Sequence, residues 1–246
     1  MRKRAPARPR SLSNGLAILY EDKDLLVVDK PAGLLTVATA HEKSRTAHSL
    51  LTEYIRIGCG RSRKQLSIVH RLDRDTSGTL IFAKSEEAMF RLKDRWKQTE
   101  KKYLAVVHGR CEKSSETITS YLAEDEDYTV YSTSDSAKGK LSHTAYTVLR
   151  VTKRYSLLEV TLLTGRKNQI RVHLAGIGHP IVGDMKYGRE DGQHRMALHA
   201  RSISFDHPFS GKRLSFESVV PEFFTTLVGR IELTQSPVKQ LHPSIS

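Results

Sequence analysis

The sequence predicts an α+β domain built on a mainly antiparallel sheet. Short apolar segments typical of strands outnumber the segments that have helical periodicity. The two kinds of segment do not alternate in the regular β–α–β order of a doubly wound parallel fold. A chain of 246 residues with 38% hydrophobic residues is long and apolar enough to form a packed core, which excludes a wholly disordered protein.

Ten short segments are rich in apolar residues and are bounded by turn-forming residues, which predicts a strand for each. In His143–Val151, polar and apolar side chains nearly alternate, as they do in a strand with one buried face. In chain order, the predicted strands are Leu16–Tyr20, Leu25–Asp29, Leu66–Val69, Thr79–Ala83, Tyr103–His108, Tyr128–Ser132, Thr144–Val151, Ser156–Leu163, Ala197–Phe205 and Arg213–Phe216.

Three segments have the pattern of a helix. In Thr46–Ile57, four apolar side chains fall on one face, and the segment ends before Gly58. Ser85–Gln98 begins with a capping serine and two glutamates, which suit the dipole of a helix N-terminus. Asn168–Ile177 brings three apolar side chains together and stops at Gly178, shortly before a proline.

The composition indicates a polyanionic partner. Forty Lys and Arg residues against 27 Asp and Glu give a formal charge of +13, which favours nucleic acid as the partner, with a merely basic soluble protein as the alternative. No apolar run approaches the roughly 18 residues of a membrane span, and the basic start lacks the apolar stretch of a secretion signal. Two cysteines, Cys59 and Cys111, cannot form a disulfide framework and fit a reducing, cytoplasmic location.

The chain is predicted to contain one domain between two polar ends. Residues 1–14 hold five Lys and Arg, two prolines and no acidic residue, which is typical of a flexible basic arm. Residues 234–246 are polar, contain two prolines and are expected to form a loose tail. Residues 15–233 contain no internal repeat and no low-complexity linker, and therefore form the predicted domain.

Residues 70–78, HRLDRDTSG, carry the densest set of reactive side chains. They link two predicted strands, and a loop on a rigid scaffold can present reactive groups. Neighbouring arginines would keep the Asp73 or Asp75 carboxylate ionised, and an ionised carboxylate can act as a base or a nucleophile. On composition alone, the alternative is a solvated polar turn in which Gly78 supplies a positive φ angle.

This loop closely resembles the signature of the RluA-type pseudouridine synthases, in which HRLD is followed by two variable residues and TSG. Further segments agree with that family in order and spacing, over roughly residues 16–225. They are Leu25–Leu34 (LLVVDKPAGL), Lys102–Gly109 (KYLAVVHG), Thr164–His173 (TGRKNQIRVH), Gly178–Asp184 (GHPIVGD) and Leu198–Ala200 (LHA).

The resemblance implies a pseudouridine synthase fold: a bent, mainly antiparallel sheet with flanking helices and a central basic cleft, with residues 15–233 as the catalytic domain. It implies an isomerase that converts uridine in structured rRNA or tRNA to pseudouridine. In that reaction the C1′–N1 bond breaks, the uracil turns over, and C5 bonds to C1′. The resemblance further implies no metal, no other cofactor, no obligatory protein partner and a monomer.

The resemblance also assigns roles to individual residues. The aspartate that the family requires falls on Asp73, which would remove the 2′ proton or add to the sugar. Arg171 matches the arginine that pairs with this carboxylate, and Tyr103 matches the tyrosine that packs on the target base. Arg71 matches an arginine that contacts phosphate or occupies the space of the extruded base. The other expected RNA contacts are Arg74, Thr76, Arg166 and Gln169, of which the last two could instead brace the loop.

Several alternatives remain open from the sequence. Asn168 stands where the family usually has histidine, so any role of a titrating group there is in doubt. Four histidines in the matched segments have no metal-ligand spacing, and structural roles or RNA contacts are expected. The stretch Gly60–Lys64 and the basic arm are candidate phosphate contacts, with a solvated run of charges as the alternative. A catalytically silent RNA-binding protein on the same fold and a carboxylate hydrolase that uses Asp73 and Asp75 are the rival functions.

Overall fold

The computed structural model describes residues 10–39, 42, 45–57 and 65–231. The chain divides into two compact units, Met1–Lys93 and Asp94–Ser246, here called unit 1 and unit 2. They subdivide the region 15–233, whose role as one catalytic domain stays a prediction. Among the described residues, no helix has both the length and the apolar character to cross a membrane.

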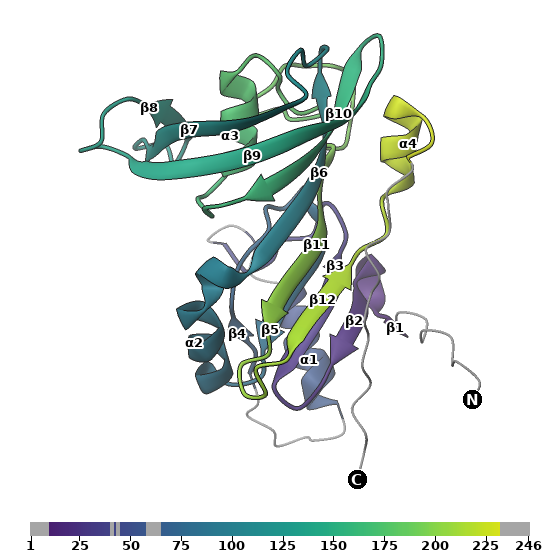
Figure 1. Ribbon diagram of the computed structural model, residues 1–246. Helices are drawn as coiled ribbons and strands as arrows, with labels where there is room; N and C mark the ends of the chain where they lie inside the picture. Colours follow the sequence, from purple (N-terminus) through teal and green to yellow (C-terminus); the bar gives the residue numbers. More distant parts are fainter. Residues whose placement is uncertain (1–9, 40–41, 43–44, 58–64, 232–246) are drawn as a thin grey trace. The chain divides into compact units, whose positions relative to one another are not determined.

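Unit 1 is a small antiparallel sheet with helices (Figure 1). Strand β3 pairs with β2 and with β5, and β1 and β4 add short pairs at β2 and β5. Its elements are β1 (Arg10–Ser11), η1 (Ser13–Gly15), β2 (Ala17–Glu21), β3 (Leu25–Lys30), α1 (Ala47–Arg56), β4 (Ser67–Ile68), β5 (Ser77–Ala83) and α2 (Glu86–Asp94). Because Arg10 and Ser11 pair with β2, the end of the predicted flexible arm is a strand.

The core of unit 1 is the β3–β5 pair. Residues Leu25–Val28 and Leu80–Ala83 have no exposed surface, so both faces of these strands are buried. The register places Lys30, the last residue of β3, opposite Gly78 near the start of β5. The end of the apolar strand therefore lies beside the end of the loop 70–78.

Two helices of unit 1 begin at capping residues, of which Ser85 was predicted and Thr46 was not. Thr46 Oγ1 accepts from the Ser49 backbone N–H (3.1 Å), and Ser49 Oγ accepts from the Thr46 N–H (2.9 Å), which is a capping box. Ser85 Oγ accepts from the Ala88 N–H (3.1 Å) at the start of α2. The predicted helix 85–98 is interrupted, since α2 ends at Asp94 and a short 3₁₀ helix, η2, follows.

Unit 2 is a longer antiparallel sheet in the order β8–β7–β9–β10–β6–β11–β12. Within the described residues, every strand pair given above for either unit is antiparallel, which confirms the predicted, mainly antiparallel sheet type. Helix α3 packs against β7, β8 and β9 (Figure 1). The elements of unit 2 are η2 (Trp96–Gln98), β6 (Glu100–His108), β7 (Ser115–Glu124), β8 (Val130–Thr133), β9 (Lys140–Val151), β10 (Tyr155–Leu162), α3 (Gln169–Gly176), β11 (Leu198–Asp206), β12 (Arg213–Glu217) and α4 (Glu222–Val228).

Candidate active site

The backbone of the loop 70–78 is fixed around Asp73. Thr36 Oγ1 donates to the Leu72 carbonyl (2.7 Å) and accepts from the Leu72 N–H (3.1 Å). The Asp73 carbonyl accepts from the Thr76 N–H (3.2 Å), which closes a turn after the aspartate. Both bonds with Thr36 are buried, so the residue preceding Asp73 is held away from water.

Lys30 fixes the other side of the same loop. Its ammonium group is fully buried and donates to the carbonyls of Pro31 (3.0 Å), Leu34 (2.7 Å) and Arg74 (3.0 Å). The Arg74 carbonyl also accepts from the Gly33 N–H (2.9 Å). An ammonium group has three protons, so these bonds use its full donor capacity. Lys30 therefore joins the Lys-Pro-Ala-Gly turn to the residue that follows Asp73.

The charge of Lys30 acts on the loop as well. Burial lowers the pKa of Lys30 to about 8, against the opposing effect of the charges of Asp75, Asp73 and Asp29. The effect of burial on the pKa thus exceeds that of the three carboxylates, because the groups that accept from the ammonium are neutral carbonyls. The result is a cation near the carboxylates of the loop, in a site from which water is excluded.

The two carboxylates of the loop differ in their surroundings. Asp73 is half-buried between the two fixed residues, whereas Asp75 is exposed. Arg71 and Arg74 are exposed, and Arg74 Nη2 forms an ion pair with Glu42 Oε2 at 2.5 Å. An oriented, partly desolvated carboxylate is better suited to chemistry than a solvated one. The geometry therefore favours Asp73 over Asp75.

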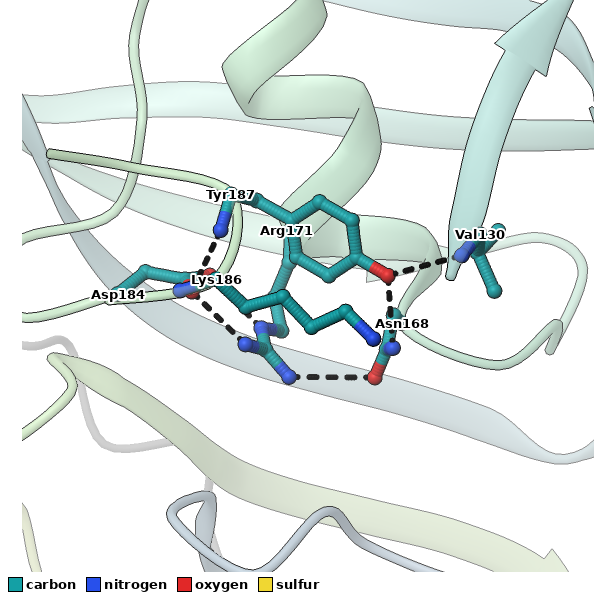
Figure 2. A network of polar contacts seen from close by, with 6 residues as sticks. All are labelled: Val130, Asn168, Arg171, Asp184, Lys186 and Tyr187. Atoms are coloured by element: carbon teal, nitrogen blue, oxygen red, sulfur yellow. Dashed lines mark hydrogen bonds and ion pairs between the residues drawn. The ribbon is translucent and has the colours of Figure 1, made fainter. Parts of the chain in front are cut away.

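In unit 2, Arg171 is the centre of a polar network (Figure 2). Its Nε and Nη2 atoms each lie 2.7 Å from an oxygen of Asp184, which makes a bidentate ion pair. Its Nη1 atom donates to Asn168 Oδ1 (3.2 Å), and its guanidinium carbon lies 4.9 Å from the centroid of the Tyr187 ring. The guanidinium is thus held along one edge, at one corner and against an aromatic ring.

Asp184 is buried and stays ionised. Burial would raise the pKa of its carboxyl, but the hydrogen bonds and charge of Arg171 and the N–H groups of Tyr187 and Lys186 outweigh burial and lower it. The bond lengths from those two N–H groups to Oδ1 are 3.1 and 3.0 Å. A full negative charge therefore faces Arg171.

Gln169 stabilises the start of α3. Its Oε1 accepts from Thr164 Oγ1 (2.9 Å) and the Arg166 N–H (3.0 Å). Its Nε2 donates to the His143 carbonyl and to Thr144 Oγ1, both at 2.9 Å. The side chain is 2% exposed, and these four bonds are what a bracing role requires. The expected contact of Gln169 with RNA stays a prediction.

The remaining predicted site residues lie in different environments. Thr76 is buried in unit 1, where its side chain is 2% exposed, and Arg166 is exposed before α3. Tyr103 lies on β6 opposite Val160 of β10 and is 7% exposed. Asp73 belongs to unit 1 and Arg171 to unit 2, so their expected pairing stays a prediction. Residues 1–9, 58–64 and 232–246, which include most of the basic arm, Gly60–Lys64 and the tail, lie outside the described residues.

The histidines of the matched segments bind groups of the protein itself. His70 Nε2 accepts from the Ile81 N–H (3.1 Å), and a ring nitrogen of His179 bonds to the His108 carbonyl (2.9 Å). His173 and His199 are buried, and burial is the main cause that lowers the pKa of each to about 4. These two imidazoles are therefore neutral at physiological pH.

Three residues of these networks were not singled out from the sequence: Lys30, Asp184 and Tyr187. Lys30 follows an apolar run and Asp29 at the end of β3, a place where lysine is normally solvated. Asp184 closes the Gly178–Asp184 segment, and Tyr187 follows it in the same turn. A charged residue at the end of a strand with two buried faces was the available signal for Lys30. No pattern in the neighbouring sequence indicates that Asp184 and Tyr187 contact the Arg171 side chain.

Comparison with known proteins gives a consistent result. A family model described as RNA pseudouridylate synthase matches residues 24–176. An uncharacterized RNA pseudouridine synthase of Mycoplasma pneumoniae is 36% identical over 225 residues, covering 89% of this chain and 71% of that protein. The ribosomal large subunit pseudouridine synthase D of Zymomonas mobilis is 32% identical over 232 residues, covering 88% and 73%.

Two solved structures have the same fold as this chain. The structure of human RNA pseudouridylate synthase domain containing 1 superposes with a TM-score of 0.69 at 26% identity, over 90% of this chain and 91% of that one. That of human RNA pseudouridylate synthase domain containing 4 gives a TM-score of 0.70 at 25% identity, over 85% and 90%. The fold predicted from the sequence is thereby confirmed.

Proposed function

The chain belongs to the RNA pseudouridylate synthase family and is an isomerase of RNA, and we propose that it modifies specific uridines in structured ribosomal or transfer RNA through Asp73. The observation that carries the role of Asp73 is the fixed backbone on both sides of it. Leu72 is bonded to Thr36, and Arg74 is bonded to Lys30. A carboxylate on such a support keeps its orientation while the substrate is rearranged.

The reaction asks three things of the protein. A uracil stacked in RNA must be extruded, at a cost of a few kcal/mol, and the proposed role of Arg71 is to contact phosphate or fill the vacated space. Asp73 then removes the 2′ proton to give a glycal or adds to C1′, and in either route the C1′–N1 bond breaks. The uracil turns and C5 bonds to C1′; in the glycal route Asp73 returns the proton to C2′, and in the adduct route the Asp73–C1′ bond breaks as C5 attacks. The C5 proton then leaves to solvent, and N1 gains a proton.

Two further roles follow from the family resemblance. Tyr103 packs on the uracil while it is detached, and stacking on a base contributes about 1–3 kcal/mol. The proposed role of Arg171 is to pair with the Asp73 carboxylate and orient it. The excess positive charge of the chain supplies affinity for the RNA backbone that weakens as salt rises. A monomer in the cytoplasm is part of the same proposal.

The test is conversion of uridine in transcribed tRNA and ribosomal RNA fragments, followed by mass spectrometry of the nucleosides. Asp73→Asn is expected to lower the rate at least about 100-fold while RNA binding persists, because the amide cannot act as base or nucleophile. Asp75→Asn, a change at the exposed carboxylate of the same loop, is the matched control and is expected to retain activity. Turnover by Asp73→Asn at the wild-type rate would overturn the proposal.

The same assay separates the rival functions. Release of free uracil would indicate a hydrolase, since isomerisation retains the base on the ribose. Binding of RNA by a wild-type protein that converts no uridine in either RNA class would indicate a silent binding protein. Maps of pseudouridine in total RNA, with and without the protein, then identify the modified positions.

A further inference from the structure

Asn168 lies at a junction between Arg171 and Tyr187. It precedes α3 and has left-handed backbone angles (φ 52°, ψ 17°), a conformation that asparagine tolerates better than most residues. Its side chain makes no capping bond to the helix. The amide instead accepts from Arg171 Nη1 (3.2 Å) and donates from Nδ2 to the Tyr187 hydroxyl oxygen (2.9 Å).

The orientation of the amide is fixed by chemistry. A guanidinium group can only donate hydrogen bonds, so the Asn168 oxygen must face Arg171. The Asn168 NH₂ group then faces Tyr187, whose hydroxyl oxygen can accept. The same oxygen accepts from the Val130 N–H (3.1 Å). Figure 2 shows this continuous path from Asp184 through Arg171 and Asn168 to Tyr187 and Val130.

The far end of the path is anchored in the core of unit 2. The Tyr187 ring packs on a small buried cluster formed by Leu122, Val130 and Val172. The ring therefore has a fixed position, from which its hydroxyl holds the amide and its face contacts Arg171. Asp184 sets one edge of the guanidinium, whereas Asn168 is the link that ties its Nη1 corner to the core.

We propose that Asn168 is a positioning residue for Arg171, and that this position requires a side chain that accepts from the guanidinium and donates to the phenol at the same time. The inference rests on the proposed function for the importance of Arg171. It goes further in naming a second residue that sets the orientation of that arginine.

Asn168→Gly is the decisive variant, because glycine accepts the left-handed backbone without strain and removes only the amide. We expect kcat for uridine conversion to fall about 10-fold with KM nearly unchanged, since misorientation of a reacting group costs rate more than binding. Tyr128→Gly is the matched control: Tyr128 also has a left-handed backbone (φ 58°), is exposed and lies in unit 2. It is expected to leave kcat unchanged.

Asn168→His tests the requirement for simultaneous accepting and donating. A neutral imidazole can accept at one ring nitrogen and donate from the other, whereas an imidazolium can only donate. We expect Asn168→His to keep most of the activity at pH 8 and to lose it, relative to wild type, below pH ~6.5. Among the described residues, the charged groups of this network are Arg171, its partner Asp184 and Lys186 over the Tyr187 ring, and the neighbouring Lys167 pairs with Glu124. A profile parallel to that of wild type would contradict the proposal.

A readout without substrate separates this inference from the proposed function. Rotation of the Arg171 guanidinium, followed by ¹⁵N exchange of its side-chain N–H signals, is expected to be faster in Asn168→Gly than in wild type. If the wild-type protein converts no uridine but rotation is still faster in Asn168→Gly than in wild type, the proposed function fails and the positioning role stands. Unchanged rotation, or unchanged kcat in an active enzyme, would overturn the positioning role itself.

Discussion

Lys30 in unit 1 and Arg171 in unit 2 are both cations with little exposure to water, but they are held by opposite kinds of partner. Lys30 donates to three neutral backbone carbonyls, and the carboxylates near it act only through space. Arg171 forms a bidentate ion pair with Asp184, whose side chain is 1% exposed. One cation thus supports a loop, and the other is itself supported.

Because Lys30 has neutral partners and Arg171 has a charged one, the two regions respond differently to pH. Carbonyl dipoles offset only part of the cost of burying a charge, so the pKa of Lys30 falls to about 8 and the group can lose its proton in mild alkali. A guanidinium does not deprotonate in proteins, and its carboxylate partner keeps a lowered pKa despite burial. The loop around Asp73 is therefore sensitive to base, whereas the Arg171–Asp184 pair is not.

The largest expected effect comes from breaking the ion pair of unit 2. Asp184→Asn removes the bidentate, buried counter-charge of Arg171, and the loss of such a partner typically lowers the free energy of unfolding by about 3–5 kcal/mol. Urea denaturation measures it. Glu217→Gln is the control, because Glu217 pairs with Arg201 in the same unit, is more exposed and is expected to cost less than about 1 kcal/mol. Equal losses for both variants would show that burial does not distinguish the two pairs.

The next largest expected effect is the change in the free energy of unfolding as Lys30 titrates, which the Arg171–Asp184 pair does not show. Between pH 8 and 10.5 the unfolded chain binds this proton and the folded chain does not, so the free energy of unfolding rises with pH across that window. The rise is on the order of 3 kcal/mol, at about 1.4 kcal/mol per pKa unit. Activity is expected to fall over the same range, because neutral Lys30 loses one donor and its attraction to Asp73.

Lys30→Met tests this assignment directly. Its unfolding free energy, measured by denaturation from pH 7 to 10.5, is expected to lose the rise that wild type shows. Lys93→Met changes an exposed lysine of the same unit and is expected to keep that rise. A rise of the same size in Lys30→Met would mean that another group titrates in this window.

Much of the fold could be predicted from the sequence, but only where the pattern that indicates an element lies within a few residues. Strands with buried faces and helices with capping residues were identified, because alternation and caps lie within a few residues. Strand β7 was missed, since Ser115–Glu124 is largely polar and stabilised by pairing with β8 and β9. Helix α4 was missed because its seven residues are too few for a periodic pattern.

The site divides in the same way. Asp73 and Arg171 were identified through motifs, and their supports were not. Lys30 becomes buried only because the turn after β3 meets the loop 70–78, more than forty residues along the chain. Asp184 reaches Arg171 because α3 and the turn 184–188 fold onto each other. Contacts of this kind depend on tertiary packing, which periodicity does not encode.

The smallest expected effect is a loss of stability at low pH through His173, which lies in the same helix as Arg171. His173 lies between Ser120 Oγ (3.0 Å) and Thr144 Oγ1 (2.9 Å), and Thr144 also binds Gln169. Burial, with a further contribution from His143, lowers the pKa of His173 to about 4. Below its ordinary value of 6.5 the unfolded chain binds the proton more readily, so the free energy of unfolding falls as pH drops from 6.5 towards 4.

His173→Gln is therefore expected to be less sensitive to acid than wild type, by about 2 kcal/mol between pH 6.5 and 5. Denaturation at the two pH values measures the difference, with His194→Gln, at an exposed histidine, as the control. An unchanged loss of stability in His173→Gln would assign the acid sensitivity to other groups, of which the buried His199 is the first to test. A reduced loss would mean that acid destabilises the helix carrying Arg171 through protonation of the neutral His173, and not through the Arg171–Asp184 ion pair.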